Sequence, residues 1–401
     1  MHDLYLFRTF YGAYQTFVNG YYVSATAYDQ YATTQEQAVQ DFHTLDDSLF
    51  LSDTNRHPAD GLMLIISKEI LTKDWHTVLC RYLLTVLHTI VISWPFITNV
   101  ATVLYRLLIT WCEPILSSDS LLGIKYILGD FTQSGYEKVN DTGYNNKNIY
   151  KNPYALELGY KTSDDISSEI HADNILEYQN ALLSRIVGHL VQCYKTCTAE
   201  KTKNNDGYSW TVTSPEQDSV LYGYCNYTSG NDLKLYIDGN LRTEYSIWSA
   251  YKTFQVGDGN TPAHIVQLKG TLQRSREIDG VFYYLDMQEF RDVMREISQN
   301  QVTTFDLQDK YIKCEYTAQS DELLLLTIPY DDGWTAYVNG EKVEAYKLQD
   351  IFTGIRVTSG INTIEMKYTL PEFKIGVIFS CLGVIVYSLT CFFLFKKQRH
   401  F

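Results

Sequence analysis

The chain has 401 residues, 45% of them hydrophobic and 20% charged, which suits two or three globular domains. A formal net charge of −14 excludes nucleic acid as an expected partner, because nucleic acids select basic surfaces. Eight scattered cysteines lack the Cys-x-x-Cys spacing of zinc and redox sites. We therefore expect no disulfide framework, metal or other cofactor.

Residues 1–75 are predicted to form a mixed segment with one helix. Within it, residues 27–42 space Tyr, Ala and Val among polar side chains, which indicates the helix. The residues after Met1 lack the basic and apolar regions of a signal peptide. An exported domain needs an earlier membrane segment, so we expect the chain to be the end of a longer membrane protein. The alternative is that a C-terminal segment alone anchors it.

Residues 76–113 allow three interpretations. The stretch is strongly apolar, but Arg81, His88 and Arg106 interrupt it and Pro95 divides it. Each half has about the minimum length of a membrane span. An arginine near the centre of a span costs about 2.5–3.5 kcal/mol. The stretch is therefore a membrane hairpin, a buried core segment or the product of a disrupted reading frame.

Residues 114–200 are predicted to form an α/β connecting region. Residues 120–128 are predicted to form a buried strand, and 152–160 is predicted to be extended. Residues 177–187 have apolar side chains at helical spacing, which predicts a short amphipathic helix. The charged residues that follow, 199–207, indicate a linker.

Residues 207–284 and 301–371 are predicted to form two related, jelly-roll-like β-sandwiches. Each contains an apolar run that ends in a turn, and the turn glycines Gly239 and Gly340 are 101 residues apart. Asn339 and Gly340 form a pair that favours a tight hairpin, because both turn positions need φ > 0. This period indicates two copies of a domain rather than a solenoid, whose repeats span about 20–50 residues.

Residues 285–300 are predicted to form a crossover helix between the two sandwiches. Asp286 and Glu289 have the spacing of a capping box. The helix is expected to bury one apolar face, which consists of Met287, Phe290, Met294 and Ile297.

Residues 375–395 are predicted to form a transmembrane helix. They comprise 21 residues without a charge, enough to cross a hydrocarbon core of about 30 Å. The basic residues in 396–401 mark the cytoplasmic side. The lipid bilayer is thus an expected partner, in a bacterial cell membrane, with the bulk of the chain extracytoplasmic and the C-terminus cytoplasmic. The expected fold class is α+β and β-rich: two sandwiches, a mixed N-terminal region and one membrane helix.

The sequence contains no motif of a catalytic site. The patterns Gly-x-Ser-x-Gly, His-Glu-x-x-His, Asp-x-Asp and the P-loop are all absent. Tyr330, Trp334, Tyr337 and Phe352 are candidate glycan-stacking residues, because aromatic rings offer flat apolar faces. The competing interpretation is that these four side chains pack inside the second sandwich.

Several segments resemble the YfhO family of multi-pass bacterial membrane proteins. They follow the family order across residues 115–401, namely LLGIKYIL at 121–128, NPYAL at 152–156, QNALL at 179–183, IPYDDGW at 328–334 and PEFKIG at 371–376. The resemblance implies a fold similar to the C-type glycosyltransferases. It also implies transfer of a sugar from a polyprenyl-phosphate carrier to a cell-envelope polymer such as teichoic acid.

In this resemblance the chemistry belongs to acidic residues in an outer loop of the N-terminal membrane half. That half has no counterpart here, so no catalytic residue is assigned and the chain is expected to be inactive alone. Its expected role is to bind the acceptor glycopolymer or to cap the membrane site. The family pattern also has a soluble segment where 76–113 stands. The alternative is a non-enzymatic, membrane-anchored envelope protein with carbohydrate-binding-like sandwiches.

Overall fold

The computed structural model describes two short strands near the N-terminus and most of the chain from residue 114 onward. The described residues are 51–54, 65–66, 114–129, 131–139, 148–226, 233–245, 253–270, 277–308, 310–369, 382 and 385. The expected helix at 27–42 and the apolar segment 76–113 lie outside them.

The expected membrane segment, 375–395, is also largely outside the described residues. Only Leu382 and Ile385 of that segment are described, and both are helical. Among the residues described, no helix is long and apolar enough to span a membrane. The membrane helix and the cytoplasmic position of 396–401 therefore stay predictions.

The described part is rich in β-structure, as predicted. Its strands form five sheets, in which every described pair is antiparallel except β1 with β3. One sheet has the order β2-β1-β3-β5-β4 and consists of β1 (Leu51–Thr54), β2 (Ile65–Ile66), β3 (Ile124–Gly129), β4 (Glu137–Lys138) and β5 (Asn148–Lys151). The helices of the described ranges are α5 (Leu116–Leu121), α6 (Ile175–Val187), α7 (Met287–Ser298) and the 3-10 helix η2 (Asp164–Ser167).

The first sandwich pairs an inner sheet, β13-β10-β15-β7, with an outer sheet, β12-β11-β14-β9-β8. Its strands are β7 (Tyr194–Thr196), β8 (Thr198–Asn204), β9 (Gly207–Thr213), β10 (Ser219–Asn226), β11 (Leu233–Ile237), β12 (Asn240–Tyr245), β13 (Thr253–Asp258), β14 (His264–Gly270) and β15 (Asp279–Asp286). Trp210, 1% exposed, packs in its core against Phe282, with ring centroids 5.9 Å apart.

The second sandwich pairs an inner sheet, β21-β22-β18-β6, with an outer sheet, β16-β17-β23-β19-β20. Its strands are β6 (Gly159–Thr162), β16 (Thr304–Gln308), β17 (Tyr311–Ala318), β18 (Glu322–Pro329), β19 (Trp334–Val338), β20 (Glu341–Val343), β21 (Ala345–Leu348), β22 (Phe352–Val357) and β23 (Gly360–Tyr368). All strands but β6 come from one continuous stretch of chain.

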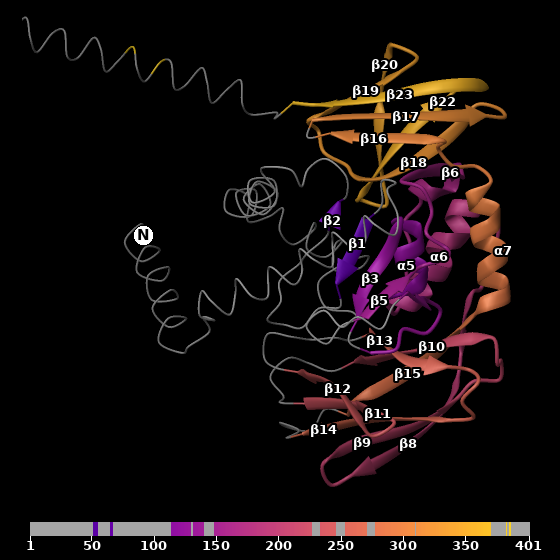
Figure 1. Cartoon of the computed structure of the whole chain (residues 1–401), viewed down its shortest axis with the longest axis vertical. Helices are drawn as coiled ribbons and strands as arrows, with labels where there is room; N and C mark the ends of the chain where they lie inside the picture. Colours follow the sequence, from indigo (N-terminus) through magenta and orange to yellow (C-terminus); the bar gives the residue numbers. More distant parts are fainter. Residues whose placement is uncertain are drawn as a thin grey trace, which may run out of the picture.

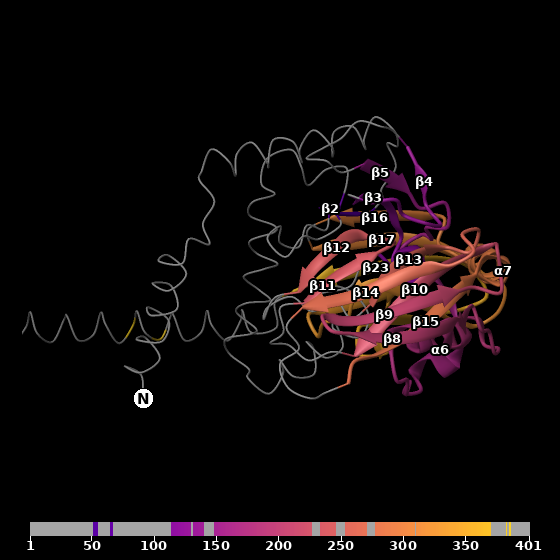
Figure 2. The ribbon, with the colours of Figure 1, turned by 90° about the horizontal axis from the view of Figure 1, so that it is seen from below.

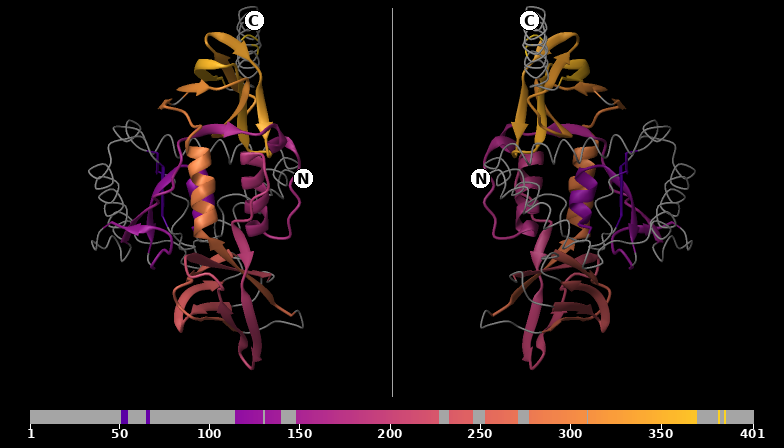
Figure 3. Two further views of the ribbon diagram at one scale, coloured as in Figure 1. Left: turned by 90° about the vertical axis from the view of Figure 1, so that its right-hand side faces the viewer. Right: turned by 90° about the vertical axis from the view of Figure 1, so that its left-hand side faces the viewer.

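The two sandwiches stand at opposite ends of an elongated body (Figure 1). The helices, with β3 and β5, lie between them, and α6 and α7 stand side by side there (Figure 3). Figure 2 looks along the long axis from the end that carries the first sandwich.

Both inner sheets are buried on two faces. In β18, Leu324 and Leu326 point into the second sandwich, whereas Leu323 and Leu325 point into the central core. A strand buried on both faces needs no polar alternation, which explains the continuous apolar run. The same division holds in β10 of the first sandwich, where Leu221 faces the sandwich core and its neighbours face the centre.

Helix α7 has the cap and the buried face expected from the sequence. The Asp286 carboxylate accepts hydrogen bonds from the backbone amides of Gln288 and Glu289, which satisfies two unpaired donors of the first turn. The buried side chains are Met287, Phe290, Met294 and Ile297, with Val293 added. They pack in the central core, between the two inner sheets.

The linker prediction for 199–207 was wrong. These residues largely form β8, the edge strand of the first outer sheet, which is antiparallel to β9. All of β8 but Ala199 is exposed. An edge strand that faces solvent on both sides has no apolar pattern to reveal it, and its charged side chains are typical of protected sheet edges.

Candidate functional site

The four candidate glycan-stacking residues do not share a surface. Phe352 is 2% exposed and belongs to the central core. Trp334 is half-buried against the second sandwich core, where its ring meets Tyr368 edge-on at 5.0 Å. Tyr337 lies three positions further along β19 and so points to the opposite, outer face. Tyr330 follows β18 and is half-buried. A single four-ring platform is therefore not formed.

Each outer sheet carries instead a lysine that lies over the ring of a partly exposed tyrosine. In the first sandwich the Lys269 Nζ lies 5.0 Å from the ring centroid of Tyr236. In the second, the Lys367 Nζ lies 5.1 Å from Tyr337 and 5.9 Å from Tyr311. Each lysine is on the strand next to Tyr236 or Tyr337, two positions beyond the residue directly opposite that tyrosine. Such diagonal contacts combine a cation with an aromatic face.

A second group of polar side chains is buried around α5, which packs between the first sandwich and α6. The Ser117 hydroxyl lies 2.7 Å from the Tyr194 hydroxyl and donates to the Gln179 side-chain oxygen at 3.2 Å. The hydroxyl of Tyr222 accepts the Leu116 backbone amide at 3.1 Å. These bonds tie α5 to α6, β7 and β10.

The carboxylate of Asp119 extends this cluster. It accepts a 2.6 Å hydrogen bond from the Tyr136 hydroxyl, and Asp119 is only 8% exposed. Burial raises the pKa of Tyr136 well above its ordinary value, and the charge of Asp119 adds to that rise. Burial likewise raises the pKa of Tyr194. Both phenols are neutral at physiological pH and act as hydrogen-bond partners, so the cluster holds α5 in place.

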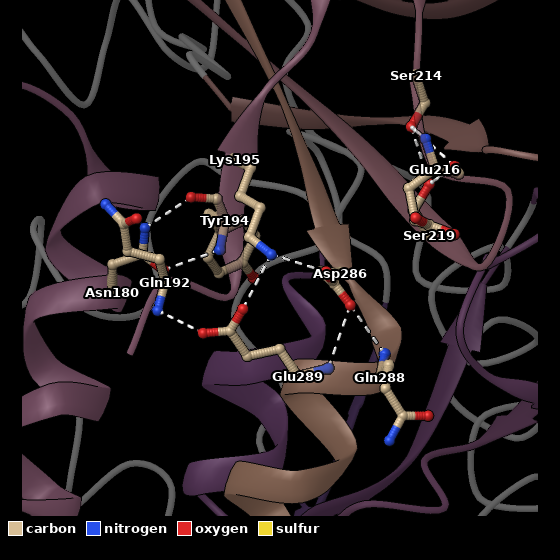
Figure 4. Close-up of polar contacts among 10 residues, drawn as sticks. All are labelled: Asn180, Gln192, Tyr194, Lys195, Ser214, Glu216, Ser219, Asp286, Gln288 and Glu289. Carbon is tan, nitrogen blue, oxygen red and sulfur yellow. Dashed lines mark hydrogen bonds and ion pairs between the residues drawn. The ribbon is translucent and has the colours of Figure 1, made fainter. Parts of the chain in front are cut away.

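The ion pairs of Lys195 form a third group, at the first turn of α7 (Figure 4). Its ammonium lies 2.8 Å from Asp286 and 2.9 Å from Glu289. Hydrogen bonds to these two carboxylates raise the pKa of Lys195. Burial acts to raise the pKa of Asp286, but the hydrogen bonds from Lys195 and from two α7 amides outweigh it and lower that pKa. These ion pairs anchor β7 to α7.

Strand β7 is held from the other side by α6. Asn180 pairs with both backbone groups of Tyr194: its amide donates to the carbonyl at 2.7 Å, and its oxygen accepts the amide at 2.8 Å. Glu289 accepts the backbone amide of Gln192 at 2.8 Å. Figure 4 shows these contacts converging on β7. This edge strand is thus paired to helix side chains where a further strand would otherwise bind.

Within the described ranges there is no candidate metal site and no activated cysteine. No group of three or more His, Cys, Asp or Glu side chains there could hold a metal. The cysteines of that part are unpaired thiols, and burial raises the pKa of each to about 12, namely Cys193, Cys197, Cys225 and Cys314. Thiols with such pKa values are poor nucleophiles at physiological pH.

The chain resembles one family and one curated protein by sequence. The family model described as bacterial membrane protein YfhO matches residues 115–380. A Bacillus subtilis (strain 168) protein described as uncharacterized protein YfhO is 25% identical over 323 residues, which cover 70% of this chain and 36% of that protein. The chain therefore spans about a third of that relative's length.

Two solved structures share local similarity only. One is a Paenibacillus cycloisomaltooligosaccharide glucanotransferase, 8% identical, with 48% of this chain and 50% of that chain covered. The other is a conserved protein of unknown function from Pseudomonas aeruginosa PAO1, 13% identical, with 43% and 82% covered. Both TM-scores are 0.15, too low to support an argument about fold.

Proposed function

The chain belongs to the YfhO family of bacterial membrane proteins, and on that basis we propose that the described region is the extracytoplasmic part of a membrane glycosyltransferase. The complete protein transfers a sugar from a polyprenyl-phosphate carrier to a cell-envelope polymer such as a teichoic acid. Catalysis belongs to the membrane portion of the family protein. The region described here binds the acceptor polymer and covers the membrane site.

The repeated tyrosine–lysine pair carries the proposal for acceptor binding. Tyr236 with Lys269 and Tyr337 with Lys367 occupy matching places on outward sheet faces at opposite ends of the body. A tyrosine offers a flat face and a hydroxyl to a sugar or polyol. A lysine ammonium is a point charge that attracts phosphate. Two such pairs on one body suit a long ligand with repeating units, because the second contact forms at a raised effective concentration.

The experiment measures binding of the full-length chain, in detergent, to lipoteichoic acid with a polyglycerol-phosphate backbone. We expect the double variant Tyr236→Ala/Tyr337→Ala to lose about tenfold or more in affinity, equivalent to about 1.4 kcal/mol. Binding should also weaken with added salt, because exposed charges are screened. The matched control is Thr211→Ala/Thr317→Ala, which changes exposed positions on the same two outer sheets.

Two results would overturn the acceptor-binding role. One is wild-type affinity in the tyrosine double variant, and the other is equal loss in the threonine control. Binding that behaves as expected, without sugar transfer by any complete family member that contains this region, favours the second candidate function. In that case the region belongs to a non-enzymatic envelope protein.

A further inference from the structure

The two outer sheets have the same strand order. The first is β12-β11-β14-β9-β8 and the second is β20-β19-β23-β17-β16. When the strands of each outer sheet are numbered along the chain, the same ranks occupy the same places. The correspondence therefore covers ten strands and not only the two hairpins that the sequence reveals.

The correspondence extends to hydrogen bonds at the hairpin turns. Asp238 donates its amide to the carbonyl of Ile265 at 2.9 Å and accepts the Ile265 amide on its carboxylate at 2.7 Å. Asn339 does the same with Thr363, at 2.8 and 2.9 Å. Both turn residues have positive φ, 52° and 53°. One local design is thus present twice.

The inner sheets match only if β15 of the first sandwich is compared with β6 of the second, although these strands come from distant parts of the chain. In the first sandwich the order is β13-β10-β15-β7, and in the second it is β22-β18-β6 beside β21. The place of β15 next to β10 is taken by β6 next to β18. The place of β7 is taken by Gln301, which forms an isolated bridge with Tyr160 of β6.

Strands β6 and β15 also correspond in the order of the chain. Each is the strand that precedes a long helix: β6 comes before α6, and β15 runs directly into α7. The chain therefore divides into two units in which strands and the long helix follow in the same order, β6 to β14 and β15 to β23. Yet β6 of the first unit pairs with β18 of the second, and β15 of the second pairs with β10 of the first.

We propose that the region is two copies of one unit that have exchanged their first strands. Each unit leaves an open edge on its inner sheet, at β10 or at β18, and the partner that fits this edge is the leading strand of a second copy. The two copies are joined in one chain here. The inference does not depend on the proposed function, because it rests on strand pairing alone.

Side chains fix the exchanged strand in its sheet. Lys161 of β6 lies 2.8 Å from the carboxylate of Glu322 in β18, whose side chain is 2% exposed. Tyr160 is fully buried and donates its hydroxyl to the Leu121 carbonyl at 3.1 Å. A Cβ on Gly159 would lie 2.7 Å from a methyl group of Leu326. The pairing of β6 with β18 is therefore close-packed and charge-matched.

Disulfide capture in the full-length chain tests the exchange. Lys161 lies opposite Leu324 in the exchanged arrangement. Leu221 is the third residue of β10, as Leu324 is of β18, and each belongs to a sandwich core, so an unexchanged β6 would place Lys161 opposite Leu221. Opposite residues of antiparallel strands have Cα atoms about 4.5–5.5 Å apart, which a disulfide can span. A site for a sequence-specific protease, inserted between Gly270 and Glu277, separates the two units after folding.

After oxidation, cleavage and denaturation, Lys161→Cys/Leu324→Cys should migrate as one linked species without reductant and as two fragments with it. In the matched variant Lys161→Cys/Leu221→Cys both cysteines lie in the N-terminal fragment, so its readout is the mobility of that fragment, which should be the same with and without reductant. Two fragments from Lys161→Cys/Leu324→Cys without reductant, or a reductant-sensitive mobility of the N-terminal fragment of Lys161→Cys/Leu221→Cys, overturns the exchange.

A double-mutant cycle keeps the test decisive if buried cysteines prevent folding. Lys161→Met and Glu322→Gln, singly and together, are compared by thermal unfolding. If β6 pairs with β18, the double variant loses less in Tm than the sum of the single losses, because each substitution removes the same contact. Additive losses overturn the pairing.

Discussion

Replacement of Asn180 by alanine should lower the free energy of unfolding by about 2–4 kcal/mol, because it removes the contact of α6 with β7. The side chain makes two hydrogen bonds, of 2.7 and 2.8 Å, with the backbone of Tyr194. Tyr194 is 2% exposed, so both of its backbone groups lose partners that water replaces poorly. An unsatisfied buried group costs about 1–3 kcal/mol. The sum for two groups, reduced because Asn180 itself is half-buried, gives the range.

The measurement is urea unfolding of the chain in detergent, with tryptophan fluorescence as the probe. Asn180→Asp keeps the acceptor and loses the donor, so we expect about half of the alanine effect. Gln192→Ala is the control, because Gln192 bonds to Glu289 through its backbone amide, which the substitution keeps. A loss below about 0.5 kcal/mol for Asn180→Ala would show that α6 does not hold β7.

Four further outcomes are expected. Trp210→Ala should cost about 3–5 kcal/mol in urea unfolding, as aromatic truncations in cores do, and the half-buried Trp334→Ala should cost less. Burial acts to raise the pKa of Glu322, but hydrogen bonds from Lys161 and Tyr316 lower it. The Tm advantage of the wild type over Lys161→Met should therefore shrink as the pH falls below 4.5, the ordinary value; a constant difference contradicts this. In intact cells, Asn339→Cys should react with a membrane-impermeant maleimide, and protection would reverse the proposed topology. The purified 401-residue chain should transfer no sugar from a polyprenyl-phosphate donor, because the donor site is proposed to lie elsewhere in the family protein.

Local features of the fold could be predicted from the sequence because their causes are local. Gly239 and Gly340 adopt φ values of 81° and 86°, as tight hairpins require. Asp286 caps α7 with two hydrogen bonds, and the apolar spacing that follows matches the buried face. In each case a few adjacent residues determine the backbone.

The four candidate aromatic residues do not form one platform, and for two of them the spacing in the sequence explains why. Trp334 and Tyr337 are separated by an odd number of positions in one strand, and an odd separation places side chains on opposite faces. Tyr337 instead contacts Lys367 through its ring. Lys367 is 30 positions away in the sequence and becomes a neighbour only through the pairing of β19 with β23. Such a contact requires the register of two strands.

The buried polar cluster depends on still longer connections. Ser117, Gln179 and Tyr194 come from α5, α6 and β7, and nothing in their spacing indicates that they meet. The available signal was compositional: residues 116–121 combine two leucines with three serines and an aspartate, and every one of them is buried. Buried polar side chains need partners, so this pattern predicts a network but not its members.

The exchange of the leading strands could not be predicted from the sequence, for a related reason. Leu221 and Leu324 stand at equivalent places in two inner strands that are buried on both faces, so hydrophobicity does not distinguish the two edges. The two strands differ at their first, polar residue, which is Glu322 in β18 and Ser219 in β10. Paired with β10, Lys161 would face a serine; paired with β18, it neutralises a buried carboxylate. This ion pair favours the β18 edge, since an unpaired buried carboxylate would penalise the other arrangement.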